Sequence, residues 1–224
     1  MELTKSKLKQ TEVGLIAHDW KVFPLKSLLV ENPKYGIGAA AIEFNYDSYT
    51  YLRITDIDES GRIIESGLKS VEHAECGNYI LDEGELVFAR TGASVGKSYL
   101  YNKADGVLIY AGFLIKVKPD RRLLDPDYLK DFVKTKTYWN WLAVNSMRSG
   151  QPGINSNELG TLLIPLPPTL TEQKAIASTL SDVDDLIANL DKLITKKKAI
   201  KQGAMQQLLT PTESWETKPL RELA

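Results

Sequence analysis

The segment with the clearest potential for chemistry is a glycine-rich stretch at residues 92–98, which reads Gly-Ala-Ser-Val-Gly-Lys-Ser. A nucleotide-binding P-loop combines two glycines with Lys and Ser, so that backbone amides and an ammonium group hold phosphates. That loop needs four residues between its glycines and opens a helix, whereas three residues separate Gly92 from Gly96 here and Tyr-Leu-Tyr follows. We therefore interpret the stretch as a turn between two strands that exposes Ser94 and Lys97, rather than as an ATP site.

A second stretch, residues 32–41, combines two patterns found in cofactor-dependent enzymes. Residues 32–35 read Asn-Pro-Lys-Tyr, which is similar to the Asn-Pro-Pro-Tyr motif of adenine methyltransferases, and residues 36–41 resemble a dinucleotide-type glycine loop. A nucleotide-binding loop needs a strand before it and a helix after it. Pro33 precedes this loop and Phe-Asn-Tyr-Asp follows it, so the required context is absent. We expect no methyltransferase activity in the chain itself.

Metal-ligating and nucleophilic side chains are few. The chain has one cysteine, Cys76, and two histidines, His18 and His73, which is too few for a usual zinc site or a Ser-His-Asp or Cys-His catalytic arrangement. A single cysteine is consistent with a reducing cytoplasm, and no apolar run approaches the roughly 18 residues of a membrane helix. The sequence therefore predicts a cytoplasmic protein that has no site of these kinds, holds no metal or cofactor and does not enter a membrane.

Elements that would position these residues follow from local patterns in a chain of 224 residues, of which 43% are hydrophobic. Short runs rich in branched and aromatic residues predict strands at 51–57, 86–90 and 107–118. Asp125 followed by Pro126 predicts a helix start, and the prolines within 162–168 predict an extended edge segment. The fold class expected is α+β, with a globular mixed α/β domain followed by a long coiled-coil-forming helix.

The long helix is the clearest of these elements. Residues 169–172 read Thr-Leu-Thr-Glu, a capping box, and no proline interrupts the pattern before Pro211. A helix over 171–209 would be roughly 58 Å long at 1.5 Å per residue. Its apolar residues alternate spacings of four and three, which is typical of a coiled-coil seam, and they are Ile176, Leu180, Val183, Ile187, Leu190 and Ile194. Such a seam needs a partner helix, unless the helix packs on its own domain and its charges are only solvated.

Charge along this helix is segregated. Acidic residues occupy the first part, from Glu172 to Asp191, and lysines dominate the second part, from Lys192 to Lys201. Antiparallel pairing places acidic against basic ends, whereas parallel pairing would align like charges. The pattern predicts antiparallel self-association or pairing with a second copy of the same unit.

An internal repeat supports the second option. The spacing of Trp20, Pro24, Leu25 and Leu28 recurs at residues 215–223, which restarts a unit of about 195 residues. We therefore divide the chain into a domain at 1–168, a helix at 169–210 and the start of a second unit at 211–224. The chain would be a natural half of a two-fold repeated molecule or one cut near that restart, and the short restart favours truncation; coincidence over a short window is the alternative.

Four stretches in the same order, at residues 14–25, 84–96, 149–168 and 172–210, resemble the specificity subunits of type I restriction-modification systems, with Ala17 where the family commonly has Pro. The resemblance covers nearly the whole chain. It implies that 1–168 is a target-recognition domain for double-stranded DNA and that 169–210 is the conserved spacer helix. It also implies that methyltransferase (modification) subunits dock on the helices and methylate adenine, and that a restriction/translocase subunit translocates and cleaves. The chain itself is then not an enzyme. This chain carries one recognition domain, so dimerisation would restore two half-sites.

Within such a recognition domain, polar and basic loop residues contact phosphates and base edges, with Arg or Lys suited to guanine and Gln or Asn to adenine. The candidates are Arg90, Ser94 and Lys97 in the first loop and Arg148, Ser149, Gln151 and Asn155 in the second. The structural alternatives are that Arg90 forms an ion pair and that Arg148 and Gln151 cap or solvate a loop. The net charge of −1 argues mildly against phosphate contacts. The alternative function is a coiled-coil adaptor with a β-rich ligand-binding domain and no DNA role.

Overall fold

The computed structural model describes residues 8–210 together with residues 219 and 221. The chain separates into two compact units, with the division between Ser178 and Thr179. Most of the repeat expected at 215–223, including Trp215, lies outside the described residues. No helix in the described part of the chain is long and apolar enough to cross a membrane.

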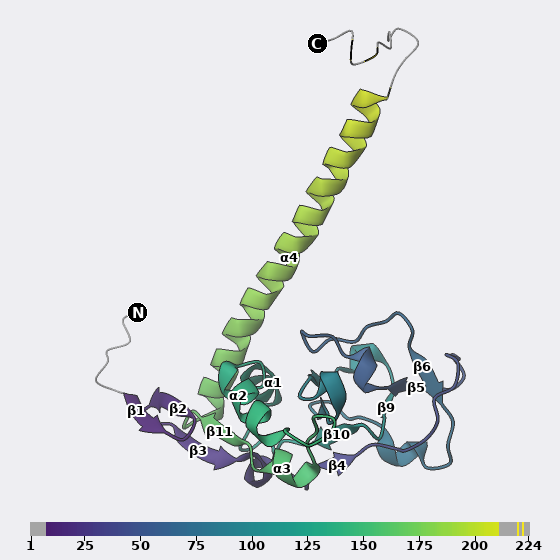
Figure 1. Cartoon of the computed structure of the whole chain (residues 1–224). Helices are drawn as coiled ribbons and strands as arrows, with labels where there is room; N and C mark the ends of the chain where they lie inside the picture. The colour runs from purple at the N-terminus through teal and green to yellow at the C-terminus, as the bar shows by residue number, and fades with distance from the viewer. Residues whose placement is uncertain (1–7, 211–218, 220, 222–224) are drawn as a thin grey trace. The chain divides into compact units, whose positions relative to one another are not determined.

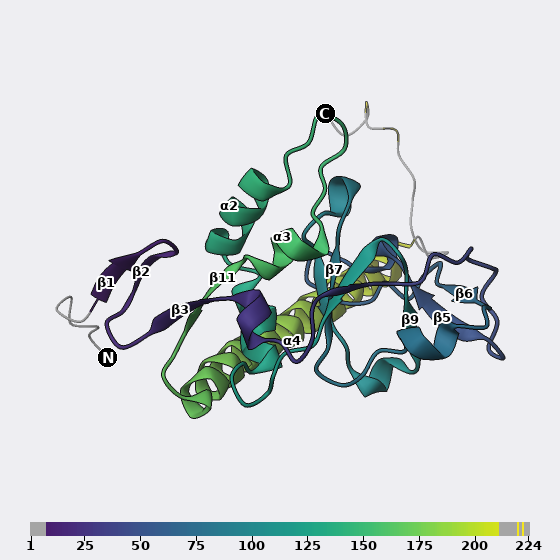
Figure 2. The same ribbon diagram turned by 90° about the horizontal axis from the view of Figure 1, so that it is seen from below.

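Four small sheets form the first unit in its described part. The strands of the largest sheet, in order, are β4 (Lys34–Tyr35), β10 (Leu114–Val117), β7 (Leu86–Ala89) and β8 (Ser98–Leu100). A three-stranded sheet contains β6 (Lys69–Val71), β5 (Tyr49–Leu52) and β9 (Leu108–Tyr110). The remaining pairs are β1 (Leu8–Thr11) with β2 (Gly14–Ala17), and β3 (Lys21–Pro24) with β11 (Leu163–Leu166). The β1–β2 hairpin lies at one end of this unit and the sheet of β5, β6 and β9 at the other (Figures 1 and 2).

Helical segments complete the architecture. The α-helices are α1 (Pro126–Phe132), α2 (Lys136–Asn145), α3 (Ser156–Gly160) and α4 (Leu170–Leu209). Short 3-10 turns occur at η2 (Leu25–Leu28), η3 (Ile54–Asp56), η4 (Cys76–Tyr79), η5 (Gly92–Ser94) and η6 (Lys103–Asp105). The combination of small sheets with helices, ending in a 40-residue helix, confirms the expected α+β class.

Strand β7 is the centre of the packing, because all four of its residues are buried. Side chains alternate between the two faces of a strand. Leu86 and Phe88 accordingly join the cluster that includes the helices, whereas Val87 and Ala89 join a second cluster with residues of β8 and β9. A strand buried on both faces is a rigid support for the turn that follows it.

Local signals located several elements correctly. β7 confirms the strand at 86–90, and the Asp125 carboxylate caps α1 by accepting hydrogen bonds from two backbone amides. Among the described strands β11 pairs only with β3, in agreement with the edge position that the prolines of that segment predicted. Two strand predictions need correction. The strand expected at 51–57 ends at Leu52, and the one expected at 107–118 is two strands, β9 and β10, with a turn between them.

The start of α4 belongs to the first unit and is anchored there by buried polar contacts. Gln173, which is 2% exposed, accepts a hydrogen bond from the Asp125 amide and donates one to the Leu123 carbonyl. The capping box is half formed, because Thr169 Oγ1 accepts from the Glu172 amide at 3.2 Å. The Glu172 carboxylate instead accepts from the Trp20 indole at 3.1 Å, which ties α4 to the segment before β3.

Candidate nucleic-acid interface

The glycine-rich segment forms a tight turn between β7 and β8. Ala89 and Lys97 close it, with the Ala89 amide donating to the Lys97 carbonyl at 2.8 Å and the Gly96 amide donating to the Ala89 carbonyl at 2.8 Å. The short η5 helix lies within the turn, and strand β8 follows it. The structure therefore confirms a turn between strands, as predicted, in place of the helix that a P-loop requires.

This turn meets the loop at residues 147–155, although the two are separated by about 55 residues of sequence. The Gly92 amide donates to the Pro152 carbonyl at 3.0 Å, and the Ile154 amide donates to the Arg90 carbonyl at 2.9 Å. Thr91 and Gly153 form an antiparallel bridge between these two contacts. The two sets of candidate residues, predicted from separate loops, thus lie on adjoining segments held together by backbone hydrogen bonds.

Arg90 has the most distinctive surroundings of the candidates. Its backbone amide donates to the Phe113 carbonyl at 3.0 Å, and its guanidinium carbon lies 4.5 Å from the ring centroid of Tyr35. The Nε atom is buried and has no hydrogen-bond partner. Among the described residues no carboxylate pairs with Arg90, so the structural ion pair considered as its alternative role is absent in the described part of the chain.

Tyr35 was not among the residues expected at this site. It ends β4, and its hydroxyl accepts a hydrogen bond from the Ser156 amide, the first residue of α3, at 3.0 Å. Burial raises the pKa of Tyr35, but the hydrogen bond from Ser156 and the charge of Arg90 outweigh it, so the pKa lies below its usual value. Tyr35 is the last residue of the Asn-Pro-Lys-Tyr stretch, which was compared only with methyltransferase motifs. Its position beside Arg90 was therefore not predicted from the sequence.

Three other candidates already have partners within the domain. Lys97 pairs with Glu59 at 2.8 Å, and the Arg148 guanidinium contacts both carboxylate oxygens of Glu158. The Asn155 side chain caps α3 by accepting from the Glu158 amide at 2.8 Å. These contacts favour loop-bracing roles for Arg148 and Asn155. Ser94, Ser149 and Gln151 make no side-chain hydrogen bonds to other described residues, and Ser149 and Gln151 are exposed.

Both the backbone conformation and the packing of the turn depend on Gly96. Its φ of +85° suits glycine, and a Cβ added there would lie 2.0 Å from Cδ2 of the buried Leu142. A left-handed conformation costs an alanine about 1–2 kcal/mol, and an overpacked core costs about 1–3 kcal/mol more. We expect Gly96→Ala to lower the free energy of unfolding, measured by urea titration, by about 2–5 kcal/mol.

A matched control separates the two contributions to this loss. Gly67 has a similar φ of +83°, but a Cβ there would have no atom within 4 Å. Gly67→Ala should therefore lose only the conformational part. Equal losses for the two variants would show that the contact between Gly96 and Leu142 does not limit the turn.

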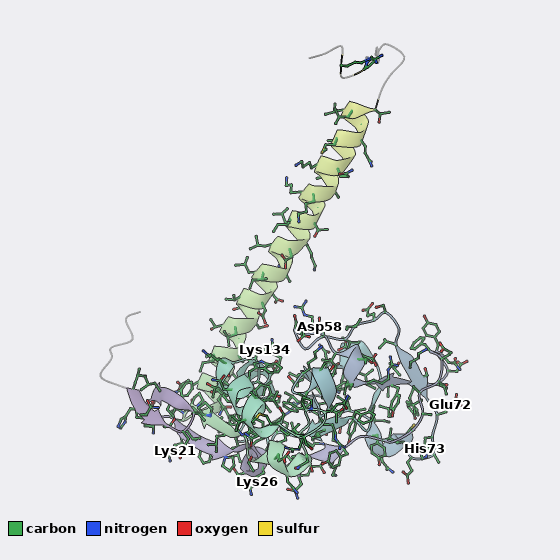
Figure 3. All side chains as sticks on the ribbon, viewed as in Figure 1. Lys21, Lys26, Asp58, Glu72, His73 and Lys134 are labelled. Atoms are coloured by element: carbon green, nitrogen blue, oxygen red, sulfur yellow. The ribbon has the colours of Figure 1, made fainter. Side chains whose placement is uncertain are left out.

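Figure 3 shows Lys21 and Lys26 on the part of the first unit that carries β3 and η2, and Glu72 and His73 on the part that carries β6. Among the described residues there is no group of three or more His, Cys, Asp or Glu side chains that could hold a metal ion.

The exposed face of α4 is a second candidate interface. Five of the six expected seam residues are about half exposed, between 45% and 52%, and they are Leu180, Val183, Ile187, Leu190 and Ile194. The sixth, Ile176, is partly buried and packs against the core of the first unit. A second apolar row, missed from the sequence, consists of Leu186, Leu193 and Ile200 at intervals of seven residues.

Comparison with known proteins places these features in a family. Residues 17–202 match the model of the type I restriction modification DNA specificity domain. The putative type I restriction enzyme MjaX specificity subunit of Methanocaldococcus jannaschii is 32% identical over 211 residues, covering 90% of this chain and 48% of the relative. The MjaVIII specificity subunit of the same organism is 30% identical over 131 residues, covering 58% of this chain and 29% of that protein. The chain thus spans about half the length of MjaX and less of MjaVIII.

Solved structures share the fold. The HsdS subunit from Thermoanaerobacter tengcongensis is similar with a TM-score of 0.62 at 18% identity, covering 90% of this chain and 52% of that one. The type I restriction-modification S subunit from M. genitalium gives a TM-score of 0.58 at 18% identity, covering 96% of this chain and 49% of that one. Because the family model spans both the sheet-containing domain and most of α4, this chain belongs to the family of type I restriction modification DNA specificity domains.

Proposed function

We propose that this chain is the sequence-specific DNA recognition subunit of a type I restriction-modification complex. It reads one half of a bipartite site, docks the methyltransferase subunits and has no catalytic role of its own. The observation that carries this proposal is the family match over residues 17–202. The relatives from M. jannaschii, which are named as specificity subunits, support it.

The DNA-reading surface in this proposal is the junction between the β7–β8 turn and the loop at 147–155. Arg90, Ser94 and Gln151 carry donors that no described residue uses, and such groups suit the edges of base pairs. Lys97 serves as a phosphate contact, because an ion pair with an exposed carboxylate is weak in water and exchanges for phosphate at little cost. Glu59, the partner of Lys97, is 82% exposed.

The helix α4 provides the pairing surface. Two copies pair antiparallel through Leu180, Val183, Ile187, Leu190 and Ile194, so that the acidic first half of each helix meets the basic second half of the other. A rigid helix pair fixes the separation of two readers, and therefore the length of the unread gap between the half-sites.

The second apolar row supports the docking of other subunits. Leu186 and Leu193 directly precede the seam residues Ile187 and Ile194, so this row borders the seam and makes the apolar face wider than a two-helix seam needs. A helix of the methyltransferase subunit is the proposed occupant. That subunit binds S-adenosylmethionine and methylates adenine, and a restriction/translocase subunit joins in the full complex. In this proposal, the complex of this chain with these subunits acts on DNA in the cytoplasm.

The proposal is tested by measuring duplex DNA binding for the chain alone, for its methyltransferase subunit alone, and for the two together. We expect tight binding by the pair, weakening steeply with salt as phosphate contacts are lost. The absence of DNA binding by the pair would favour a coiled-coil adaptor. Calorimetry should show S-adenosylmethionine binding to the methyltransferase subunit only, and binding to this chain alone would contradict its non-catalytic role.

A further inference from the structure

The guanidinium group of Arg90 is held in place without an anionic partner. Its backbone is fixed on both sides, by the Phe113 carbonyl and by the Ile154 amide. It follows the fully buried strand β7, so the base of the side chain cannot move far. Neighbouring basic groups are neutralised, Lys97 by Glu59 and Arg148 by Glu158. Arg90 has no such carboxylate among the described residues.

An arginine in this state has unused hydrogen-bonding capacity. The buried Nε atom has no acceptor in the described part of the chain, and buried donors in native proteins are nearly always paired. Arg90 is only partly buried, so the outer edge of its guanidinium group is open to a ligand. A planar guanidinium group with a free edge matches the O6 and N7 acceptors of guanine, which accept two parallel hydrogen bonds.

Tyr35 is the aromatic residue that lies beside this group. Its ring lies against the Arg90 guanidinium carbon at 4.5 Å, an arrangement typical of a cation–π contact. The ring is fixed at both ends, because its hydroxyl accepts from the Ser156 amide and its backbone pairs with Ile115 of β10. Gly36, the next residue, packs so closely that a Cβ would lie 2.2 Å from the Tyr110 carbonyl oxygen. β4 therefore cannot shift to follow the arginine.

We infer that Arg90 reads a guanine in the half-site and that Tyr35 is the residue that positions it. This inference rests on the proposed DNA-recognition function and adds to it the base identity and a residue outside the predicted set. Tyr35 makes no base contact in this scheme, so specificity at one base pair depends on the orientation of Arg90 as well as on its presence.

The test is selection from a random-sequence duplex library by the complex of this chain with its methyltransferase subunit. Wild-type protein should select a guanine at one position of each half-site. Arg90→Lys keeps the positive charge but loses the two parallel donors of the guanidinium group. It should lower the preference for guanine about tenfold or more, since a bidentate contact discriminates between bases by that amount. Tyr35→Leu should lower the same preference by about tenfold, and Tyr35→Phe should retain it within about threefold.

Controls separate positioning from general damage. Tyr46, which is 93% exposed, gives a matched Tyr46→Leu variant that should select the wild-type sequence. Thermal melting checks that each variant is folded, and binding to a fixed unrelated duplex should be unchanged for Tyr35→Leu. An unchanged guanine preference in Tyr35→Leu, or an equal loss of affinity for all sequences, would overturn the positioning role. An unchanged preference in Arg90→Lys would overturn the guanine assignment. If the wild-type complex selects no sequence at all, the proposed function itself fails.

Discussion

Combining Leu180→Ala with Leu190→Ala in α4 should raise the Kd for self-association by at least about 100-fold, while the first unit stays folded. Both leucines are about half exposed in the isolated chain and become buried in the proposed helix pair. Truncating a buried leucine costs about 2–5 kcal/mol, and a two-fold pair loses four leucines. Even about 1 kcal/mol per leucine, half of the lower value, sums to about 4 kcal/mol over the four leucines, which exceeds the roughly 2.7 kcal/mol that corresponds to 100-fold. Light scattering over a concentration series measures the change.

A control for this prediction lies on the same helix. Ser181→Ala with Thr195→Ala alters two exposed positions outside the apolar rows and improves helix propensity. This variant should associate like wild type. Unchanged association of the leucine variant would contradict the seam, and equal weakening of both variants would point to a general effect on α4.

Glu85→Ala should lower the free energy of unfolding by about 3–5 kcal/mol, because it removes one partner of a buried ion pair. Glu85 is 1% exposed, its carboxylate lies 2.9 Å from the Lys116 ammonium and 3.4 Å from that of Lys118, and it accepts a hydrogen bond from the Asp82 amide. The variant leaves Lys116, itself only 11% exposed, without its closest anion. Urea unfolding of the purified chain measures the loss.

The comparison for this loss is an ion pair on the surface. Glu43 pairs with Lys69 at 2.6 Å, but its side chain is 92% exposed. Because exposed ion pairs contribute little in water, Glu43→Ala should leave the unfolding curve almost unchanged. Similar losses in the two variants would show that burial does not set the value of the Glu85 contacts. A small effect of Glu85→Ala would mean that the interior tolerates the remaining lysine.

Elements with strong local signals were predictable from the sequence, and those decided by polar pairing were not. Asp125 before Pro126 located the start of α1, and the heptad spacing located α4. The alternation at 51–57 failed because Asp56, which is 3% exposed, accepts from the Arg53 amide and side chain and closes a turn after Leu52. An alternating pattern shows only which residues are apolar. It does not indicate that Asp56 accepts hydrogen bonds from Arg53.

The candidate site was predictable as two loops but not as one surface. The bridge between Thr91 and Gly153 depends on packing across a long stretch of chain, which no local pattern reports. A readable signal was overlooked at residues 155–158, where Asn-Ser-Asn-Glu follows the capping-box pattern. It predicts the cap that Asn155 forms with Glu158, and so a structural role for that asparagine.

Whether this chain selects the DNA that its partners modify is tested most directly by mapping N6-methyladenine across a genome. The chain and its methyltransferase subunit would be co-expressed in a methylation-free host, with the methyltransferase subunit alone as the control. Two antiparallel copies that each read one half-site predict methylation at a single split, palindromic motif that disappears when this chain is omitted. Methylation that is identical without the chain, or none although the two subunits purify together, would contradict its role as the recognition subunit.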